Sequence, residues 1–277
     1  MLRGRLPDFL IIGAMRSGTT SLARYLGAHP GVYVAPNKEL HFFDRAFDRG
    51  LDHYRQQFAR ARGDQSAGEA TQTYLYDTTA LDRIAATLPD VKLIAILRNP
   101  VDRAYSHYWQ KRAYGREPLS FAAAVSAEPE RLRGADRDER FRYSYLDRGR
   151  YVDQLQRVTE RFPRTALHVL LFEDLRDAPE DTYRDVCRFL QVNEDMTPAN
   201  IGEPLNPFLM FRSRRLREVS RRFPPRLRNA VGRINARKGD YEPLDPGLRA
   251  ELVEYFAAPN AALAAWLGRD LSVWNGA

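Results

Sequence analysis

The fold of this chain is decided near its start by Asp8-Phe9-Leu10-Ile11-Ile12-Gly13-Ala14-Met15-Arg16-Ser17-Gly18-Thr19-Thr20. Residues 8–13 form a short apolar run, as expected of a buried strand, and they lead into a loop that carries a glycine near each end. Between Thr20 and Ala28 the apolar residues recur at helical spacing, and a Pro-Gly pair follows. The stretch therefore predicts a strand, a tight loop and a helix, in that order.

The loop has the Gly-x-x-x-x-Gly spacing of a phosphate-binding loop, with Gly13 and Gly18 as its glycines. Glycines let successive backbone N–H groups point at an anion, and the following helix adds the positive end of its dipole. A nucleoside-triphosphate loop needs a lysine directly after the second glycine, whereas Thr19 stands there and Arg16 supplies the cation. The loop thus predicts a ligand with one phosphate-like group at this end and no metal-bridged triphosphate.

Two more strand-and-helix units follow, with strands at 91–97 and 166–172 and helices near 101–114 and 181–190. Shorter strand candidates are 32–34 and 66–69. Strands that alternate with helices predict an α/β fold, a P-loop-like three-layer arrangement with a central parallel sheet flanked by helices. Ligands of such folds bind at the carboxyl ends of the strands, so the turns after Ile12 and Leu97 are expected to converge.

The rest of the chain is expected to be mainly helical. Residues 117–150 predict helix plus surface loop, and Asp245 with Pro246 predicts the start of a helix that ends near Phe256. A second helix is expected from about Pro259 to Gly268. Because no repeat or low-complexity linker is present, residues 1–277 are predicted to form a single domain.

Composition narrows the class of protein. No run of about 18 apolar residues occurs, so no membrane span is expected, and the first residues lack the apolar region of a secretory signal. Cys187 is the only cysteine, and no Cys/His cluster predicts a metal site. These features together predict a cytoplasmic protein that requires no metal.

The positive charge is concentrated in one segment. The net charge is +7, yet residues outside 203–240 carry 32 basic and 33 acidic side chains. A local excess of this kind fits an anion site near that end of the chain, although a basic run is more often a solvated helical face.

A second candidate anion site follows the strand at 91–97. Arg98 ends that strand, and Ser106 lies about two turns into the next helix, so the two side chains can close on one phosphate. This pair alone is weak evidence, because Arg98 also fits an ordinary ion pair.

These segments together resemble the PAPS-dependent sulfotransferases (PAPS is 3′-phosphoadenosine 5′-phosphosulfate), in particular bacterial members of the heparan-sulfate type. Arg16-Ser17-Gly18-Thr19-Thr20-Ser21-Leu22 is similar to their 5′-phosphosulfate loop, with Arg16 where the family usually has lysine. The resemblance implies that residues 16–21 hold the donor and that Arg16 stabilises the leaving phosphate and the transferring sulfuryl oxygens. Arginine keeps the charge but positions it differently.

The resemblance extends to the 3′-phosphate and covers most of the chain, from Phe9 to Trp274. Residues 98–106 are similar to the family's Arg-Asp/Asn-Pro-x-x-Arg-x-x-Ser signature, which implies that Arg98 and Ser106 hold the 3′-phosphate. Arg237-Lys238-Gly239-Asp240 resembles a Lys-Gly loop and implies that Lys238 and the Gly239 N–H cap the same phosphate. The chain departs from the family at Asp240, where arginine is common.

The segment Lys38-Glu39-Leu40-His41-Phe42-Phe43-Asp44 carries the acceptor-side candidates. In an extended segment Glu39 and His41 face one way, and both are possible bases. The segment resembles the family's Glu-x-His-Phe-Phe-Asp motif, which implies Glu39 as general base, His41 as its support or substitute and Asp44 in the acceptor site. Lys38 is a candidate for steering an anionic acceptor.

A further segment around Glu69 is similar to the family's Glu-Lys-(Thr/Ser)-Pro-x-Tyr, and Glu69 is expected to hydrogen-bond within the acceptor site or to pair with Arg16. Ala70 stands at the family's lysine position and cannot bind a sulfate or carboxylate. This departure argues against a highly sulfated polysaccharide acceptor.

The resemblance therefore implies an O-sulfotransferase that moves a sulfuryl group from PAPS to a hydroxyl of a carbohydrate, lipid or small molecule, leaving 3′-phosphoadenosine 5′-phosphate (PAP), without nucleic-acid partners. Two other classes stay open at this point. A P-loop kinase would require Mg²⁺ and the missing lysine, and a nucleic-acid-binding protein using residues 203–240 would leave the glycine loop unexplained.

Overall fold

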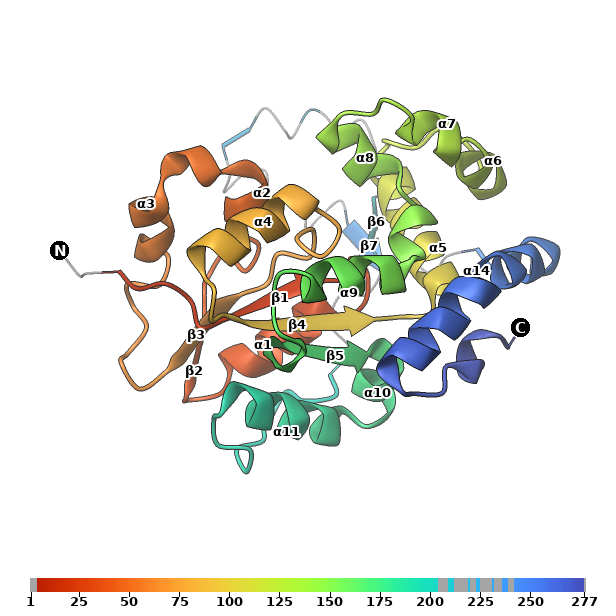
Figure 1. The fold of residues 1–277 in the computed structure, drawn as a ribbon. Coiled ribbons are helices and arrows are strands. Elements are labelled where there is room, and N and C mark those ends of the chain that lie inside the picture. The colour runs from red at the N-terminus through yellow and green to blue at the C-terminus, as the bar shows by residue number, and fades with distance from the viewer. Residues whose placement is uncertain are drawn as a thin grey trace.

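The computed structural model describes residues 4–203, 209–211, 219, 223–224, 231, 236–238 and 242–276. At its centre is a five-stranded sheet with the order β2-β3-β1-β4-β5, in which every neighbouring pair is parallel (Figure 1). Its strands are β1 (Phe9–Gly13), β2 (Val32–Val34), β3 (Ser66–Glu69), β4 (Lys92–Leu97) and β5 (Leu167–Leu171). The predicted parallel sheet is confirmed, and all five strands were expected within a residue or two of these bounds.

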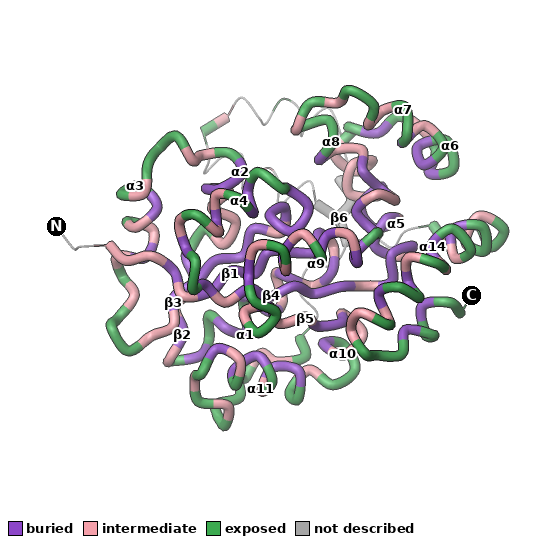
Figure 2. Tube along the Cα trace, in the orientation of Figure 1, coloured by how far each residue is buried: buried purple, intermediate pink, exposed green. Residues whose placement is uncertain are grey.

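Helices cover both faces of the sheet because the side chains of its apolar strands alternate between two cores. Leu10 and Leu93 face one hydrophobic cluster, which includes Leu81 of α4 (Thr78–Thr87) and Leu155 of α9 (Tyr151–Thr159). Phe9, Ile11, Ile94 and Ile96 face the opposite cluster, to which α1 (Thr19–Gly27) and α11 (Pro179–Leu190) contribute. Burial is accordingly continuous along β1 and nearly so along β4, and it is interrupted along the outer helices (Figure 2).

The other elements extend from this three-layer body. They are α2 (Phe42–Arg45), η1 (Phe47–Arg49), α3 (Leu51–Gln56), α5 (Pro100–Ala113), α6 (Phe121–Ser126), α7 (Glu128–Leu132), α8 (Arg137–Tyr143), η2 (Asp147–Gly149), η3 (Arg164–Ala166), α10 (Phe172–Asp177), α14 (Pro246–Leu267), η4 (Ser272–Trp274) and an antiparallel pair of β6 (Leu209–Phe211) with β7 (Ala236–Lys238). The region 117–150 thus contains short helices joined by loops, as expected.

The C-terminal prediction of two helices is wrong. α14 is one helix from Pro246 to Leu267 that contains Pro259, and Gly268 ends it in a left-handed conformation. A proline inside a helix costs about 3 kcal/mol because it removes one N–H and crowds the preceding turn. Phe256 and Leu263 are buried on either side of Pro259, and their packing holds the two halves in one helix. No helix in the described ranges is both long and apolar enough to span a membrane.

Candidate active site

Five loops meet at one edge of the sheet because the strands are parallel and their carboxyl ends point the same way. The loop after β1 is held to its neighbours by backbone bonds from Ala14 N to Ile96 O (2.7 Å) and from Leu75 N to Ile12 O (2.9 Å). The loop after β2 is held to the loop after β3 by a bond from Ala70 N to Lys38 O (2.8 Å). The predicted donor and acceptor segments therefore lie side by side.

The loop after β1 has the conformation that its glycines permit. Gly18, the residue before α1, has φ 93°, and a Cβ there would lie 3.0 Å from the Phe172 ring. A Cβ on Gly13 would lie 2.7 Å from the Leu75 Cβ. Because both positions exclude a side chain, the loop stays close to the loops beside it, and the first N–H groups of α1 are left for a ligand.

Ser17 supplies the loop after β1 with a hydroxyl group that is free to bind a ligand. Its side chain is fully buried, and its hydroxyl has no hydrogen-bond partner among the described residues. A buried hydroxyl without a partner is costly in a folded protein, and an anion held by the loop would satisfy it. Thr19, Thr20 and Ser21 lie in the first turn of the helix behind it, and Thr19 is buried.

Arg16 joins the two predicted halves of the donor site. Its Nε donates to the Ser106 Oγ over 3.0 Å, although the two residues are 90 positions apart in the chain. The Arg98 guanidinium donates to the Arg16 carbonyl oxygen (3.3 Å) and lies over the Phe172 ring, 4.9 Å from its centroid. Ser106 is buried on α5. Arg16, Arg98 and Ser106 are thus brought together as the sequence predicted.

The third predicted 3′-phosphate element is only partly visible. Lys238 ends β7, whose backbone pairs with β6 at Leu209. Gly239 lies outside the described residues, so its predicted contact has no structural counterpart here.

Glu39, His41 and Asp44 form one connected group after β2. The His41 Nδ1 contacts the Asp44 Oδ2 at 2.9 Å, and the His41 Nε2 lies 3.6 Å from the Glu39 Oε2. Lys38 donates to the Glu39 Oε1 over 2.6 Å, and the Gln72 amide donates to the same oxygen over 3.0 Å. The sequence did not single out Gln72 as a site residue. The backbone carbonyl oxygen of Gln72 lies 3.4 Å from the position of a Cβ built on Gly13. This contact places Glu39 and its partners next to the predicted donor loop.

The charges in this group reinforce one another. Burial favours neutral Glu39, but hydrogen bonds and charges from His41 and Lys38 prevail and lower the pKa of Glu39 to about 2. Burial likewise opposes charge on His41, yet Asp44 and Glu39 raise the pKa of His41 to about 9. Despite its burial, contacts with His41 and Thr73 lower the pKa of Asp44. Near neutral pH the group is therefore two carboxylates with an imidazolium between them.

Glu69, which was predicted to belong to the acceptor site, lies in the interior of the protein. It is fully buried beneath the acceptor segment and accepts hydrogen bonds from the hydroxyls of Tyr54 (3.1 Å) and Tyr74 (2.9 Å). Desolvation by burial raises the pKa of Glu69 to about 7. The Leu40 N–H also points to its carboxylate, over 3.4 Å. Glu69 thus supports the loop that carries Glu39.

Tyr74 extends this support to the start of α2. Its hydroxyl accepts the backbone N–H groups of Phe42 (3.0 Å) and Phe43 (3.3 Å) while donating to Glu69. Tyr54 stacks on the Phe42 ring with centroids 4.3 Å apart. Sequence analysis missed Tyr54 because an aromatic residue on a short helix carries no signal of its partners.

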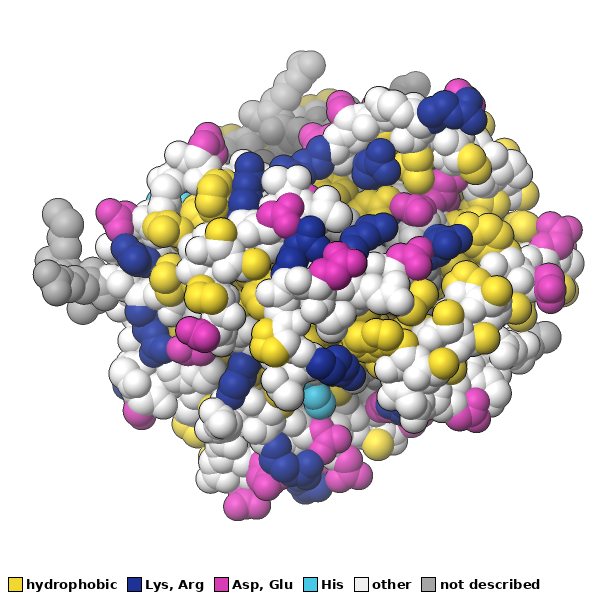
Figure 3. All heavy atoms as spheres, in the orientation of Figure 1, with side chains coloured by type: hydrophobic (Ala, Val, Ile, Leu, Met, Phe, Trp, Pro, Cys, Tyr) yellow, Lys and Arg dark blue, Asp and Glu magenta, His cyan; other side chains and the backbone are white. Residues whose placement is uncertain are grey.

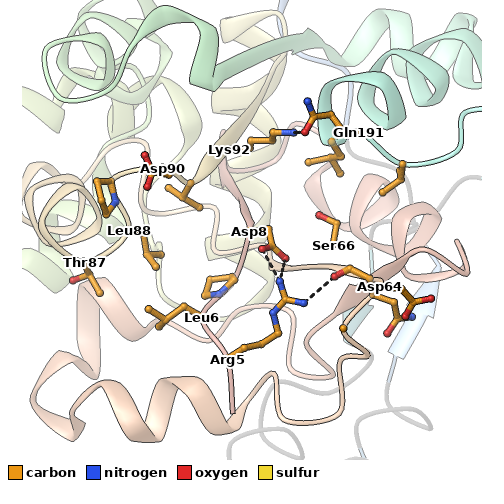
Figure 4. A pocket seen from close by; sticks show the side chains of 17 residues that line it. Arg5, Leu6, Asp8, Asp64, Ser66, Thr87, Leu88, Asp90, Lys92 and Gln191 are labelled. Carbon is orange, nitrogen blue, oxygen red and sulfur yellow. Dashed lines mark hydrogen bonds and ion pairs between the residues drawn. The ribbon is translucent and has the colours of Figure 1, made fainter. Parts of the chain in front are cut away.

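Two of the cavities in the described part of the chain differ in their relation to these loops. One of about 520 Å³ borders Glu39 and is otherwise lined by Asn37, Lys38, Leu40, Phe42, Ala46, Arg49, His53, Tyr54 and Gln57. It has the size of a small-ligand site. The other, of about 580 Å³, lies at the amino ends of β1, β3 and β4. There Arg5 pairs with Asp8, and Lys92 donates to the Gln191 side-chain oxygen (Figure 4), at the end of the sheet away from the loops described above.

Surface charge in the described part of the chain is mixed. On the face shown in Figure 3, Lys and Arg side chains lie among Asp and Glu side chains rather than in a patch of one sign. Many of the basic residues form short-range ion pairs, such as Arg150 with Asp153 (3.0 Å) and Arg269 with Asp174 (2.5 Å). This agrees with the near balance of charge outside residues 203–240.

Comparison with known proteins gives a consistent result. The sulfotransferase domain family matches residues 6–202. The chain is 30% identical, over 290 aligned residues and 98% of its length, to the mouse bifunctional heparan sulfate N-deacetylase/N-sulfotransferase 3, and 44% identical over 108 residues (39% of its length) to the human heparan sulfate glucosamine 3-O-sulfotransferase 6. It spans 31% of each of these relatives. The crystal structure of a sulfotransferase from Alicyclobacillus acidocaldarius superposes with a TM-score of 0.76 at 31% identity, covering 98% of this chain and 100% of that one.

Proposed function

Since this chain belongs to the sulfotransferase family, we propose that it transfers a sulfuryl group from PAPS to a hydroxyl of its acceptor. One observation carries the proposal: Arg16 of the glycine loop bonds directly to Ser106, so the two segments that are proposed to bind anions lie side by side. A nucleotide with phosphate groups at both its 5′ and 3′ positions needs two such segments. Family membership leaves the kinase and nucleic-acid alternatives without support.

The donor would be held by residues of adjacent loops. Residues 16–21 would receive the 5′-phosphosulfate, with the Ser17 hydroxyl and the N–H groups of α1 as donors. Arg98, Ser106, Lys238 and Gly239 would receive the 3′-phosphate. Arg16 would place its positive charge where negative charge grows on the leaving phosphate, which lowers the barrier to transfer. No metal is needed for these roles.

Glu39 is the base in this proposal. Because the pKa of His41 is raised to about 9, its ring is protonated at neutral pH and has no free lone pair with which to take a proton. Glu39 is ionised, borders the 520 Å³ cavity and lies beside the donor loop. In-line displacement requires the acceptor oxygen to attack opposite the leaving phosphate while Glu39 removes its proton. His41 and Asp44 would hold Glu39 and the acceptor, and Lys38 would attract an anionic acceptor.

The acceptor is proposed to be a hydroxyl of a carbohydrate, lipid or small molecule. The relatives named above include an O-sulfotransferase and an N-sulfotransferase, so an amine is the competing acceptor group. Glu69, buried beneath the site, would support the acceptor loop rather than contact the acceptor. A single domain and a cytoplasmic location stay predictions.

Donor binding and product mass test the proposal. Isothermal calorimetry is expected to show binding of PAP with a chelator present, and weaker binding of 5′-AMP, which lacks the 3′-phosphate. An acceptor screen with PAPS should yield a product heavier by one sulfuryl group. Mild acid hydrolysis and fragmentation would then separate sulfate esters from sulfamates. Absence of PAP binding would sink the proposal, and a sulfamate product would replace the hydroxyl by an amine.

A further inference from the structure

One face of α5 carries a row of nitrogen-bearing side chains that the proposed function does not use. Arg103, His107 and Lys111 are spaced four residues apart, so they lie on the same side of the helix. Arg148 of η2 belongs to the same group, because its charge acts on both His107 and Lys111. The row begins next to Ser106 and continues toward the end of α5.

Most of these nitrogens are buried without partners. Arg103 and His107 are fully buried and Arg148 is 3% exposed. Within the described part of the chain, five of their nitrogen atoms have no hydrogen-bond partner: Nε and Nη1 of Arg103, both ring nitrogens of His107, and Nη2 of Arg148. The Arg148 Nε does bond to the Ser144 Oγ (2.7 Å), and its guanidinium is held over the Tyr76 ring at 4.2 Å. Buried donors of this kind are expensive unless a ligand or water meets them.

The carboxylates nearest to this row are already engaged. Glu128, which acts on Arg103, accepts the backbone N–H groups of Leu146 (2.7 Å) and Asp147 (2.8 Å). Asp147, which acts on Arg148, accepts the hydroxyl of Tyr76. Neither carboxylate accepts a hydrogen bond from the unpartnered nitrogens of Arg103, His107 and Arg148.

Lys111 is the last member of the row, near the end of α5. It is partly buried, and the charges that act on it are all positive: Arg148, Arg116, Arg142 and Arg45. Burial, followed by these charges, lowers the pKa of Lys111 to about 7. Arg45 of α2, Arg142 of α8, Arg148 of η2 and Arg116, which follows α5, therefore lie near one ammonium group, and an anion placed beside it would be attracted by every one.

The position of Lys111 separates it from the donor site. It lies five residues beyond Ser106, which corresponds to about 7.5 Å along the axis of α5. Arg45, one of its neighbours, directly follows Asp44 and lies 4.0 Å from the Asp44 carboxylate. Lys111 thus stands on the acceptor side, at some distance from the loops proposed to hold the two ends of PAPS.

We propose that Lys111, backed by His107 and Arg148, binds an anionic group of the acceptor, a carboxylate or a sulfate, next to the hydroxyl that is sulfated. The assignment of this anion to the acceptor rests on the proposed function, whereas the anion site itself does not depend on it. Ala70, in the loop after β3, adds no second cation to the acceptor side. The substrate class becomes a hydroxylated molecule that carries one negative charge near its reacting oxygen.

The anion site is tested with inorganic sulfate. Protein saturated with PAP is titrated with sulfate by calorimetry, with chloride at equal ionic strength as reference. One site is expected, and Lys111→Met should weaken it at least tenfold while leaving PAP affinity unchanged. Arg24→Met on the exposed side of α1 is the matched control and should change neither. Unaltered sulfate affinity in Lys111→Met, or no sulfate binding at all, would overturn the site. Failure of PAP to bind would instead contradict the proposed function. The anion site would then be tested on the PAP-free protein, as the difference in sulfate binding between the wild type and Lys111→Met.

A matched sugar pair tests the assignment to the acceptor. Phenyl β-D-glucuronide and phenyl β-D-glucoside differ by one carboxylate, and glucose 6-sulfate against glucose provides the sulfate arm. In the PAP-bound wild type the charged member of at least one pair should bind about tenfold more tightly, and Lys111→Met should abolish the difference. The arm that shows the larger difference identifies the group. Equal binding within both pairs in the wild type would overturn the acceptor assignment.

Discussion

At the scale of single residues, the proposed acceptor site depends on two side chains whose pKa values are shifted in opposite directions. Glu39 is held ionised by Lys38 and His41, while His41 is held protonated by the carboxylates on either side of it. Glu39 therefore contributes stability above its unfolded pKa of about 4.5 that is lost as pH falls toward 2. His41 contributes stability below about pH 6.5 that is lost as pH rises through about 9.

Glu39→Gln should slow sulfuryl transfer by about 10²–10⁴-fold, the usual contribution of a general base. The amide keeps the size of the side chain but cannot accept the proton, so PAP affinity by calorimetry should stay within twofold of wild type. Glu251→Gln, on the exposed side of α14, is the control and should leave both quantities unchanged. Full turnover in Glu39→Gln would reject the base assignment while leaving the family unaffected.

Glu69→Gln tests the buried support of the acceptor loop. Because burial raises the pKa of Glu69 from 4.5 to about 7, the folded protein keeps a proton that the unfolded chain releases between these values. The stabilising contribution is therefore complete below pH 4.5 and is lost as pH rises to about 7, by roughly 1.4 kcal/mol per pH unit. Denaturant unfolding at pH 5, 6 and 7 should show a wild-type slope that is steeper than that of Glu69→Gln. Equal slopes would mean that Glu69 does not titrate in this range.

At the scale of elements, the strands were predictable and the acceptor site was predictable only in part. β1 is apolar throughout, and β4 is apolar after Lys92, because helices cover both faces, and that pattern is visible in the sequence. Glu39, His41 and Asp44 could be grouped from the sequence because they share one short segment, and their roles stay predictions. Gln72 and Tyr54 were missed because their roles arise only when segments distant in sequence pack together. The break expected at Pro259 failed because packing on both sides outweighs the local cost of proline.

Gly18→Ala should weaken PAP binding at least tenfold. The residue has φ 93° before α1, and a methyl group there would press on the Phe172 ring at 3.0 Å, so the loop must move. Gly134→Ala is a matched control, because Gly134 has φ 72° but open space around it. Both variants should lose about 1 kcal/mol of stability from backbone strain, measured by denaturant unfolding, and only Gly18→Ala should lose PAP affinity. Equal PAP affinities would show that the loop tolerates the contact.

At the scale of the whole molecule, the donor site connects two strand-and-helix units that are separate in sequence. β1 with α1 and β4 with α5 are neighbours in the sheet, and Arg16, Arg98 and Ser106 link them at the carboxyl edge. A nucleotide bound across this edge would contact both units, so its binding energy would oppose the unfolding of either.

PAP should therefore raise the midpoint of thermal unfolding. At 100 times its dissociation constant a ligand adds about 2.7 kcal/mol, on the order of 5 °C for a chain of this size. Ser106→Ala removes the hydroxyl that Arg16 contacts and should reduce the shift. Adenosine, which lacks both phosphates, is the negative control for differential scanning fluorimetry. A shift of the same size with adenosine would show that the two anion sites do not contribute.

The neighbouring positions of β1 and β4 also have an evolutionary consequence. Two of the three predicted donor segments follow the central strand β1 and its neighbour β4, whereas the acceptor candidates lie in the connections around β2 and β3 and at the far end of α5. Changes in those connections can alter which molecule is sulfated without disturbing the nucleotide. A lineage built on this sheet can therefore diversify its products while keeping a single cosubstrate, and exchange of residues 45–65 or 115–145 between relatives is the natural way to redirect it in the laboratory.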